Sequence, residues 1–296
     1  MAWHARSREL VVDGRRTHVV DAGEGPPVLL LHGFLHSSWT WRATIEALTR
    51  GGRRVIAPCL PGFGWSEVAH GDVSLAALLR WTRALLDALG VERLSCAIGN
   101  SLGGGLCLAL AHDAPARVER LALVSPLGSW LPVPSLPLRL LGASRLDPLY
   151  RATAGQPAFV RRLLQLTAYR ARIDEEVMRG FAHLSRPGSH AAAIAHARQL
   201  RAASVALARL LPQVHAPTLL VWGTHDRLLP LRWGRAIASR LPAARLEPIP
   251  GAGHCAHEEQ PERFQALLSA FLPAVRAAGN AGGPASEAPP ALRAAR

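Results

Sequence analysis

The 296-residue sequence contains no lysine, so all 34 of its basic side chains are arginine, while alanine is abundant. This pattern is typical of compositional drift in a GC-rich genome. The formal net charge of +13 therefore does not by itself indicate a surface selected to bind phosphates. The arginines are scattered in short pairs such as Arg15–Arg16 and Arg161–Arg162, and no aromatic side chains are interleaved with them. We expect no nucleic-acid partner.

Cysteine is also scarce, and the four residues Cys59, Cys96, Cys107 and Cys255 include no CxxC pair. This spacing favours reduced thiols in a cytosolic protein over a disulfide framework. The sequence also lacks an HExxH motif, and its glycine cluster lacks the lysine of a phosphate-binding loop. We therefore expect no metal and no cofactor.

Signals for export or membrane insertion are absent as well. The first ten residues, MAWHARSREL, carry charges where a signal peptide needs an apolar segment. An uncharged run covers residues 94–111, but it contains Asn100, two serines and four glycines. A strand, a turn and a helix account for this run better than a bilayer span does. We expect a cytoplasmic protein without a membrane span.

What is present is a regular alternation of strand-like and helix-like segments. Residues 8–23 alternate around Asp13-Gly14 and predict an opening hairpin. Short apolar runs then predict strands within 26–33, 53–58, 93–99, 117–125, 216–223 and 244–250. Helical spacing occurs within 41–50, 74–90, 102–112, 231–241 and 261–271. Strands that alternate with helices indicate an α/β fold with a mostly parallel central sheet flanked by helices.

The alternation is interrupted once, from about residue 126 to residue 212, where proline-punctuated segments have only helical patterning. We interpret residues 128–212 as a helical cap inserted into a core of residues 1–127 and 213–273. The rest, residues 274–296, is rich in alanine, glycine and proline and is expected to be a disordered tail.

One motif, Gly99-Asn100-Ser101-Leu102-Gly103, lies between a predicted buried strand and a predicted helix. A tight turn at this place exposes a serine hydroxyl at the edge of the sheet, provided that the flanking positions lack bulk. Gly99 and Gly103 meet that requirement. The spacing predicts that Ser101 is a nucleophile on a strand-to-helix elbow.

A nucleophilic serine needs a base, and the base needs a carboxylate that orients it. We expect His254, on the loop between the last strand and the last helix, to be the base. His32 and His257 are weaker candidates. Asp226, just after a predicted strand, is the expected acid, although a helix N-cap would also explain it. The alternative place for the acid, after the preceding strand, has the sequence LVSPLG and no carboxylate.

The tetrahedral intermediate of acyl transfer also needs hydrogen-bond donors for its oxyanion. Gly33 follows a buried strand and lets the backbone turn back toward the serine. We expect the backbone N–H groups of Phe34 and Leu102 to form the oxyanion hole.

The motifs HGF, GNSLGG, WGTHD and GAGH follow one another in the order oxyanion turn, serine, aspartate, histidine. Over about residues 8–272 the chain resembles the capped serine hydrolases of the α/β-hydrolase fold, and PGFGWSE matches a loop of that family. The resemblance implies that Ser101, Asp226 and His254 form a catalytic triad beneath a helical lid. Two positions depart from the family: Cys59 replaces a frequent acid, and Cys255 replaces the tryptophan of its carbon–carbon-bond hydrolases.

The identity of the predicted nucleophile limits the reactions that the protein is expected to catalyse. Dehalogenases and epoxide hydrolases of this fold use aspartate at the elbow, so Ser101 favours hydrolysis of an ester or related acyl bond in a small-molecule substrate. The apolar cap residues suggest an apolar substrate; they are Trp130, Leu138, Leu140, Leu141, Phe159 and Leu163. A carbon–carbon-bond hydrolase of diketone substrates ranks second, because the turn HGFLHS lacks the HGxGPG of those enzymes. A cofactor-free haloperoxidase or perhydrolase uses the same triad, and a non-catalytic binding protein is less favoured because no triad member is lost.

Overall fold

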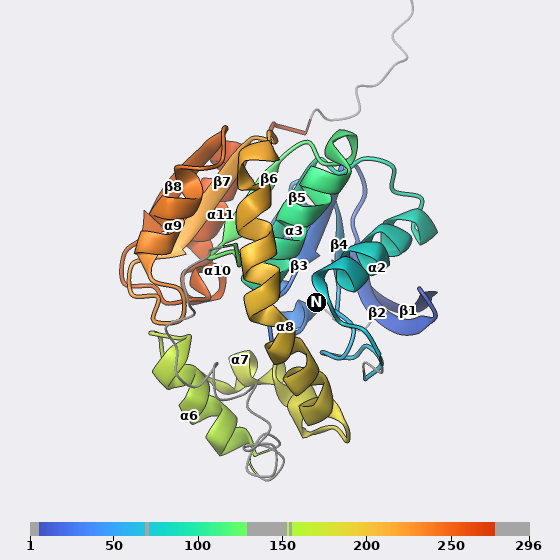
Figure 1. The fold of residues 1–296 in the computed structure, drawn as a ribbon, viewed down its shortest axis with the longest axis vertical. Helices are drawn as coiled ribbons and strands as arrows, with labels where there is room; N and C mark the ends of the chain where they lie inside the picture. The colour runs from blue at the N-terminus through green and yellow to red at the C-terminus, as the bar shows by residue number, and fades with distance from the viewer. Residues whose placement is uncertain (1–5, 69–70, 129–152, 154–155, 276–296) are drawn as a thin grey trace, which may run out of the picture.

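A computed structural model describes residues 6–68, 71–128, 153 and 156–275 (Figure 1). Its centre is an eight-stranded sheet with the strand order β1-β2-β4-β3-β5-β6-β7-β8. The strands are β1 (Ser7–Val12), β2 (Arg15–Ala22), β3 (Pro27–Leu31), β4 (Arg54–Pro58), β5 (Cys96–Asn100), β6 (Leu121–Val124), β7 (Thr218–Gly223) and β8 (Ala244–Ile249). Only the pairs β1–β2 and β2–β4 are antiparallel, and the other pairs of neighbours are parallel. The predicted α/β class with a mostly parallel sheet is confirmed.

The opening hairpin is present where the alternation predicts it. Asp13 and Gly14 both have positive φ, at 49° and 72°, which is the backbone that a two-residue hairpin turn with the strand twist requires. The hairpin adds β1 to the edge of the sheet through β2.

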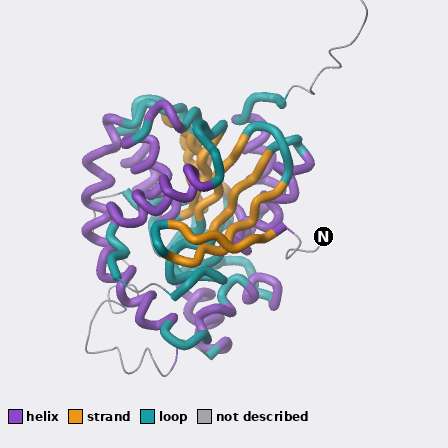
Figure 2. Tube along the Cα trace, turned by 90° about the vertical axis from the view of Figure 1, so that its right-hand side faces the viewer, coloured by secondary structure: helices purple, strands orange, loops and turns teal. Residues whose placement is uncertain are grey.

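Alternate residues along the buried strands serve two separate cores. On β3, Leu29 and Leu31 belong to one core, whereas Val28 and Leu30 belong to the other. Helices pack on both faces, as the tube in Figure 2 shows. Those on the first face include α2 (Leu75–Ala88), α3 (Leu102–Asp113) and α9 (Leu231–Ala238). Those on the second are α1 (Arg42–Arg50), α10 (Ala256–Glu259) and α11 (Pro261–Phe271).

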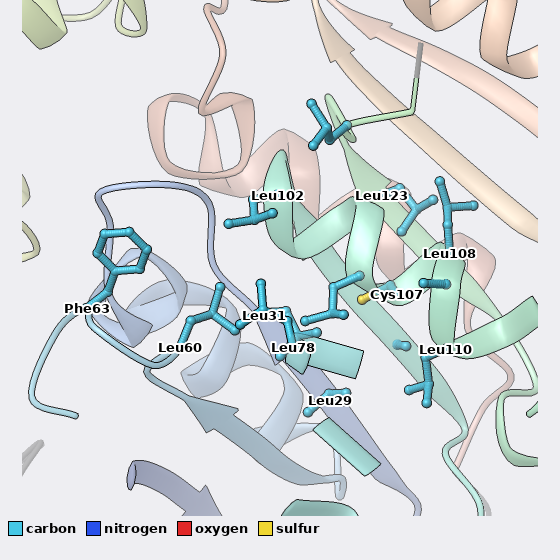
Figure 3. Close-up of a cluster of buried hydrophobic side chains, with 14 of the residues drawn as sticks. Leu29, Leu31, Leu60, Phe63, Leu78, Leu102, Cys107, Leu108, Leu110 and Leu123 are labelled. Carbon is cyan, nitrogen blue, oxygen red and sulfur yellow. The ribbon is translucent and has the colours of Figure 1, made fainter. Parts of the chain in front are cut away.

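Figure 3 shows part of the first core, where Leu102, Leu108 and Leu110 from α3 lie among side chains of the strands and of α2. Helix α3 is buried along almost its whole length, since Leu102 to Ala111 are all buried. The beginning of this helix is therefore held rigidly at the end of β5.

Only helices and turns occur among the described residues between β6 and β7, which we call the β6–β7 insertion (residues 125–217). Its helices are α6 (Pro157–Thr167), α7 (Glu175–Arg179) and α8 (Ser189–Leu210). In Figure 1, α6 and α7 lie together at one end of the molecule, and α8 runs from there along α3. Short 3₁₀ turns occur at Ser38–Trp41, Pro115–Arg117, Ala182–Ser185 and Leu211–Gln213.

Some predictions concern residues outside the described part. Trp130, Leu138, Leu140 and Leu141 of the predicted cap lie outside it, as do residues 276–296 of the predicted tail. The division into core, cap and tail stays a prediction. Among the described helices, none has both the length and the apolar character needed to cross a bilayer.

Candidate active site

Ser101 occupies a strained turn between β5 and α3. Its φ of 53° and ψ of −114° lie in a region that L residues rarely adopt. A Cβ on Gly99 would lie 2.5 Å from the backbone of Gly103, and one on Gly103 would lie 2.2 Å from the carbonyl oxygen of Leu31. Both glycines are therefore required for the close approach of α3 to β3 and β5, as the elbow motif predicts.

Asp226 and His254 come together from loops that follow β7 and β8. The Nδ1 atom of His254 lies 2.8 Å from Oδ2 of Asp226, and both residues are buried. The other carboxylate oxygen of Asp226 accepts hydrogen bonds from the backbone N–H groups of Leu228 and Leu229, at 2.9 and 2.8 Å. The carboxylate thus closes its own turn with one oxygen and orients the imidazole with the other.

The turn after β3 lies against the elbow. A Cβ on Gly33 would lie 2.6 Å from Oδ1 of Asn100 and 3.3 Å from Cβ of Ser101. Phe34 follows directly, and Leu102 is the first residue of α3, whose N–H has no acceptor within its helix. Phe34 lines the same pocket as Ser101, and Leu102 is its neighbour in the chain. That their N–H groups form an oxyanion hole stays a prediction.

A single pocket contains Ser101 and His254. Its described lining is largely apolar and comes from the turn after β3, the elbow, α6, α8 and the loops after β7 and β8. The β6–β7 insertion contributes Leu127, Leu163, Leu164, Thr167, Ala168, Tyr169, Phe181 and Leu200. Phe159, one of the apolar cap residues from which an apolar substrate was expected, is instead 40% exposed and does not line the pocket. That prediction was wrong, and Leu163 is placed as predicted.

The family model for the alpha/beta hydrolase fold matches residues 26–261 of this sequence. The chain belongs to the α/β-hydrolase fold family. It is 36% identical over 283 residues to the 2-hydroxymuconate semialdehyde hydrolase of Pseudomonas putida, covering 90% of this chain and 93% of that protein.

Two solved structures of α/β hydrolases are also similar. The meta-cleavage product hydrolase of Pseudomonas fluorescens superposes with a TM-score of 0.75 at 28% identity, covering 89% of this chain and 96% of that one. A thermophilic esterase of Thermogutta terrifontis superposes with a TM-score of 0.75 at 26% identity, covering 90% and 97%. The likeness therefore includes both carbon–carbon-bond hydrolases and an esterase.

The weaker base candidates of this α/β hydrolase are engaged elsewhere. His32 is fully buried: its Nδ1–H donates to the carbonyl of Gly33, and its Nε2 accepts from the backbone N–H of Leu60 at 2.9 Å. Burial lowers the pKa of His32 well below its usual value, so the ring stays neutral and braces the turn after β3. His257 is buried against Trp41, with ring centroids 4.2 Å apart, and burial lowers its pKa to about 3.

The two cysteines that depart from the family pattern are also buried. Cys59 lies 3.2 Å from Oγ of Ser38, and burial raises the pKa of its thiol. Cys255 lines the pocket next to His254, and burial raises its pKa well above the usual value. Both thiols therefore remain protonated at neutral pH and are poor nucleophiles.

Sequence reasoning missed the partners that hold the His254 loop. The side-chain amide of Asn100 donates to the carbonyls of Val124 and His254, at 3.1 and 3.2 Å. The backbone N–H of His254 donates to the carbonyl of Ala168 in the β6–β7 insertion at 2.7 Å. The position of Asn100 within the elbow motif was a signal for the first contact, whereas nothing in the local sequence indicates the second.

Proposed function

We propose that this α/β hydrolase cleaves a carbon–carbon bond beside a carbonyl group, in a substrate of the meta-cleavage product class, with Ser101, His254 and Asp226 as its triad. The observation that supports the proposal is the pocket whose lining contains both Ser101 and the His254 ring that Asp226 orients. The named relatives support the carbon–carbon-bond substrate. They reverse the order expected from the sequence, in which an ester ranked first.

The chemistry uses groups that surround this pocket. Ser101 Oγ attacks the carbonyl carbon while His254 Nε2 takes its proton, and Asp226 stabilises the resulting imidazolium. Oxygen becomes negatively charged in the tetrahedral intermediate and receives hydrogen bonds from the N–H groups of Phe34 and Leu102. When the intermediate collapses, the carbon–carbon bond breaks, the electron pair delocalises into the conjugated leaving group, and His254 returns the proton to it. Water then hydrolyses the acyl-enzyme by the same steps.

An esterase is the second candidate, and it would use the same steps with an alkoxide as the leaving group. Two observations favour it. No arginine occurs among the described residues that line the pocket, so no guanidinium there is placed to pair with a carboxylate on the substrate. Cys255 also stands where the family's carbon–carbon-bond hydrolases usually have tryptophan.

A direct comparison of substrates separates the two candidates. Purified protein is assayed with 2-hydroxymuconate semialdehyde, followed by the loss of its conjugated absorbance, and with nitrophenyl acetate and butyrate. We expect kcat/KM for the carbon–carbon-bond substrate to exceed that for the esters by at least about tenfold, a difference of about 1.4 kcal/mol in transition-state binding. The reverse ratio would establish the esterase. Oxidative halogenation with peroxide as the only activity would indicate a haloperoxidase.

Ser101→Ala is the control in every assay. Turnover that persists in this variant would exclude the proposed nucleophile. If neither substrate class is turned over and Ser101 does not react with a small fluorophosphonate, the chain is a binding protein on this fold.

A further inference from the structure

Next to the candidate triad lies a buried carboxylate that the proposed chemistry does not use. Glu258 belongs to α10, four residues after His254, and its side chain is only 1% exposed. An isolated carboxylate at such a site would be strongly destabilising, so its partners decide what it does.

Four donors from two distant segments converge on Glu258. The Tyr169 hydroxyl donates to Oε2 at 2.5 Å, and the Thr40 hydroxyl donates to the same oxygen at 3.1 Å. Nε2 of His36 also lies 3.1 Å from Oε2, and the Arg42 guanidinium pairs with Oε1. Tyr169 comes from the β6–β7 insertion, whereas His36, Thr40 and Arg42 come from the chain that follows the Gly33–Phe34 turn.

The His36 ring is fixed in one tautomer. Its Nδ1 accepts the backbone N–H of Ser37 at 2.9 Å, so the ring proton is on Nε2 and points to Glu258 and to the Tyr169 hydroxyl. His36 and Tyr169 also line the pocket, together with Phe34. The network therefore reaches the wall of the pocket beside a predicted oxyanion donor.

We propose that Glu258 is a positioning residue: its carboxylate fixes the turn after β3, and with it the N–H of Phe34, relative to the His254 loop and to Tyr169 of the insertion. This inference rests on the proposed function. Because α10 directly follows the His254 loop, a single buried anion connects the oxyanion turn, the base and the pocket wall.

The neighbouring carboxylate, that of Glu259, connects only two of these three segments. Glu259 accepts the backbone N–H of Gly253 at 2.9 Å and those of Arg170 and Ala171 at 2.7 and 2.8 Å. It joins the His254 loop to the insertion, but among the described residues its hydrogen-bond partners include none from the turn after β3. Of these two neighbouring glutamates, Glu258 is therefore the one whose carboxylate contacts the segment that follows the Gly33–Phe34 turn.

The test is Glu258→Gln, which keeps the shape of the side chain but removes the charge that Arg42 and the three other donors share. We expect kcat to fall about ten- to a hundredfold while KM changes little, because a misplaced donor weakens binding to the transition state more than to the substrate. The rate of Ser101 phosphonylation should fall by a similar factor, since the same N–H groups bind the phosphoryl oxygen.

Glu176→Gln is the matched control. Glu176 also pairs with Arg42, at 2.8 Å, but its side chain is 58% exposed, and among the described residues no hydrogen bond or ion pair joins it to another member of the network. We expect its kcat to equal that of the wild type. Equal kcat in Glu258→Gln and the wild type, even with a lowered Tm, would overturn the proposal and leave Glu258 a purely structural residue.

Tyr169→Phe supplies a second test if Glu258→Gln does not fold. It deletes one donor and retains the Arg42 pair, and we expect kcat to fall several-fold with a smaller change in KM. An unchanged kcat would contradict the proposal. A wild-type protein that does not react with substrates or with a fluorophosphonate would instead refute the proposed function itself, so the two failures are distinguishable.

Discussion

Ser101 is held in its left-handed backbone by three hydrogen bonds of its own peptide groups. Its N–H donates to the carbonyl of Val124 at 3.0 Å, and its carbonyl accepts from Gly105 and Leu127 at 2.9 and 2.8 Å. A residue with such a backbone stores about 1–3 kcal/mol of strain, which persists only where the surrounding structure holds it. These three hydrogen bonds hold Ser101 in its strained conformation at a position that lines the pocket.

Asp226 allows a sharp test at this scale, because its two oxygens have separate partners. In Asp226→Asn, Oδ1 can still accept from Leu228 and Leu229, so the fold should be retained. The amide would donate toward Nδ1 of His254 and favour the tautomer whose Nε2 carries the proton and cannot accept that of Ser101. We expect kcat to fall by roughly three to four orders of magnitude, measured on the preferred substrate.

The comparison variant is Asp87→Asn, which changes a surface carboxylate that pairs with Arg117 far from the pocket. Its side chain is 66% exposed, and we expect activity within about twofold of the wild type because exposed ion pairs contribute little. Near-normal turnover in Asp226→Asn would mean that another group orients the base.

How much of these residue roles the sequence reveals depends on whether the partner is local. The elbow is predictable because Gly99, Ser101 and Gly103 are close in the sequence and each has a steric reason. The bracing role of His32 is not predictable, because it depends on the N–H of Leu60 after another strand. Two neighbouring glutamates after a histidine likewise give no local indication that one of them becomes a buried anion.

At the scale of elements, α3 depends on its small residues. A methyl group at Gly103 would lie 2.2 Å from the carbonyl oxygen of Leu31 and 2.5 Å from that of His32. Neither carbonyl can move without disturbing β3 and the turn that follows it. Helix and strand therefore fit together only through glycine at this position.

Gly103→Ala should accordingly lower the free energy of unfolding by about 1–3 kcal/mol or more, through overpacking against fixed backbone. Chemical denaturation with urea measures this. Gly51→Ala is the control, since its Cβ would lie 3.4 Å from the nearest atoms and its φ is −80°. Equal stability of the two variants would show that α3 can shift away from β3.

Helix α6 shows why an element can be predicted while its buried face is misjudged. Val160, Leu163, Leu164 and Thr167 follow the spacing of one helical face, and the last three line the pocket. Phe159 is one residue before Val160 and four residues before Leu163, so it lies at the edge of that face, about 40° around the helix from Leu163, and its side chain is 40% exposed. The helical spacing of Phe159 and Leu163 predicts one shared face, but only the later part of α6, from Leu163 to Thr167, lines the pocket.

For the whole molecule, burial of several histidines links stability to pH. Burial lowers the pKa of His183 to about 3, that of His196 to about 4 and that of His257 to about 3. These rings are neutral in the folded protein, whereas in the unfolded chain they bind protons below about pH 6.5. Their contribution to stability is complete above that pH and is lost as the pH falls toward the folded-state values.

We expect the free energy of unfolding to decrease below pH 6.5, by about 1.4 kcal/mol per pH unit for each such histidine. Urea titrations between pH 7.5 and pH 5 measure the slope. His196→Gln, whose amide can still donate to the carbonyl of Pro61 as the His196 ring does at 2.9 Å, should have a shallower slope. A slope identical to that of the wild type would show that His196 does not take part in this linkage.

We expect a second decrease in the free energy of unfolding at lower pH, where Glu258 becomes protonated. Burial alone would raise the pKa of Glu258, but His36 and Arg42 outweigh it and lower the value to about 2. Stability from this carboxylate is complete above about pH 4.5 and is lost as the pH falls toward 2. The free energy of unfolding of Glu258→Gln should not show this second decrease.

The resemblance to the family implies a helical lid, but the individual contacts of the β6–β7 insertion with the pocket were the feature of the whole molecule least accessible to sequence reasoning. The parallel sheet follows from the repeated alternation of apolar strands and helices, each recognisable within its own segment. The contacts of Ala168, Tyr169 and Phe181 with the site come from residues that are distant in the chain, and no periodic pattern records them.

Mass spectrometry of the protein after reaction with a small fluorophosphonate tests the assignment of Ser101 most directly. We predict a single adduct, located on the peptide that contains Ser101 and absent from Ser101→Ala. Ser66 and Ser125 are both buried, and their alanine variants should be labelled at the wild-type rate. An adduct that persists in Ser101→Ala and disappears when Ser66 or Ser125 is replaced, or no adduct on the wild type, would contradict the assignment.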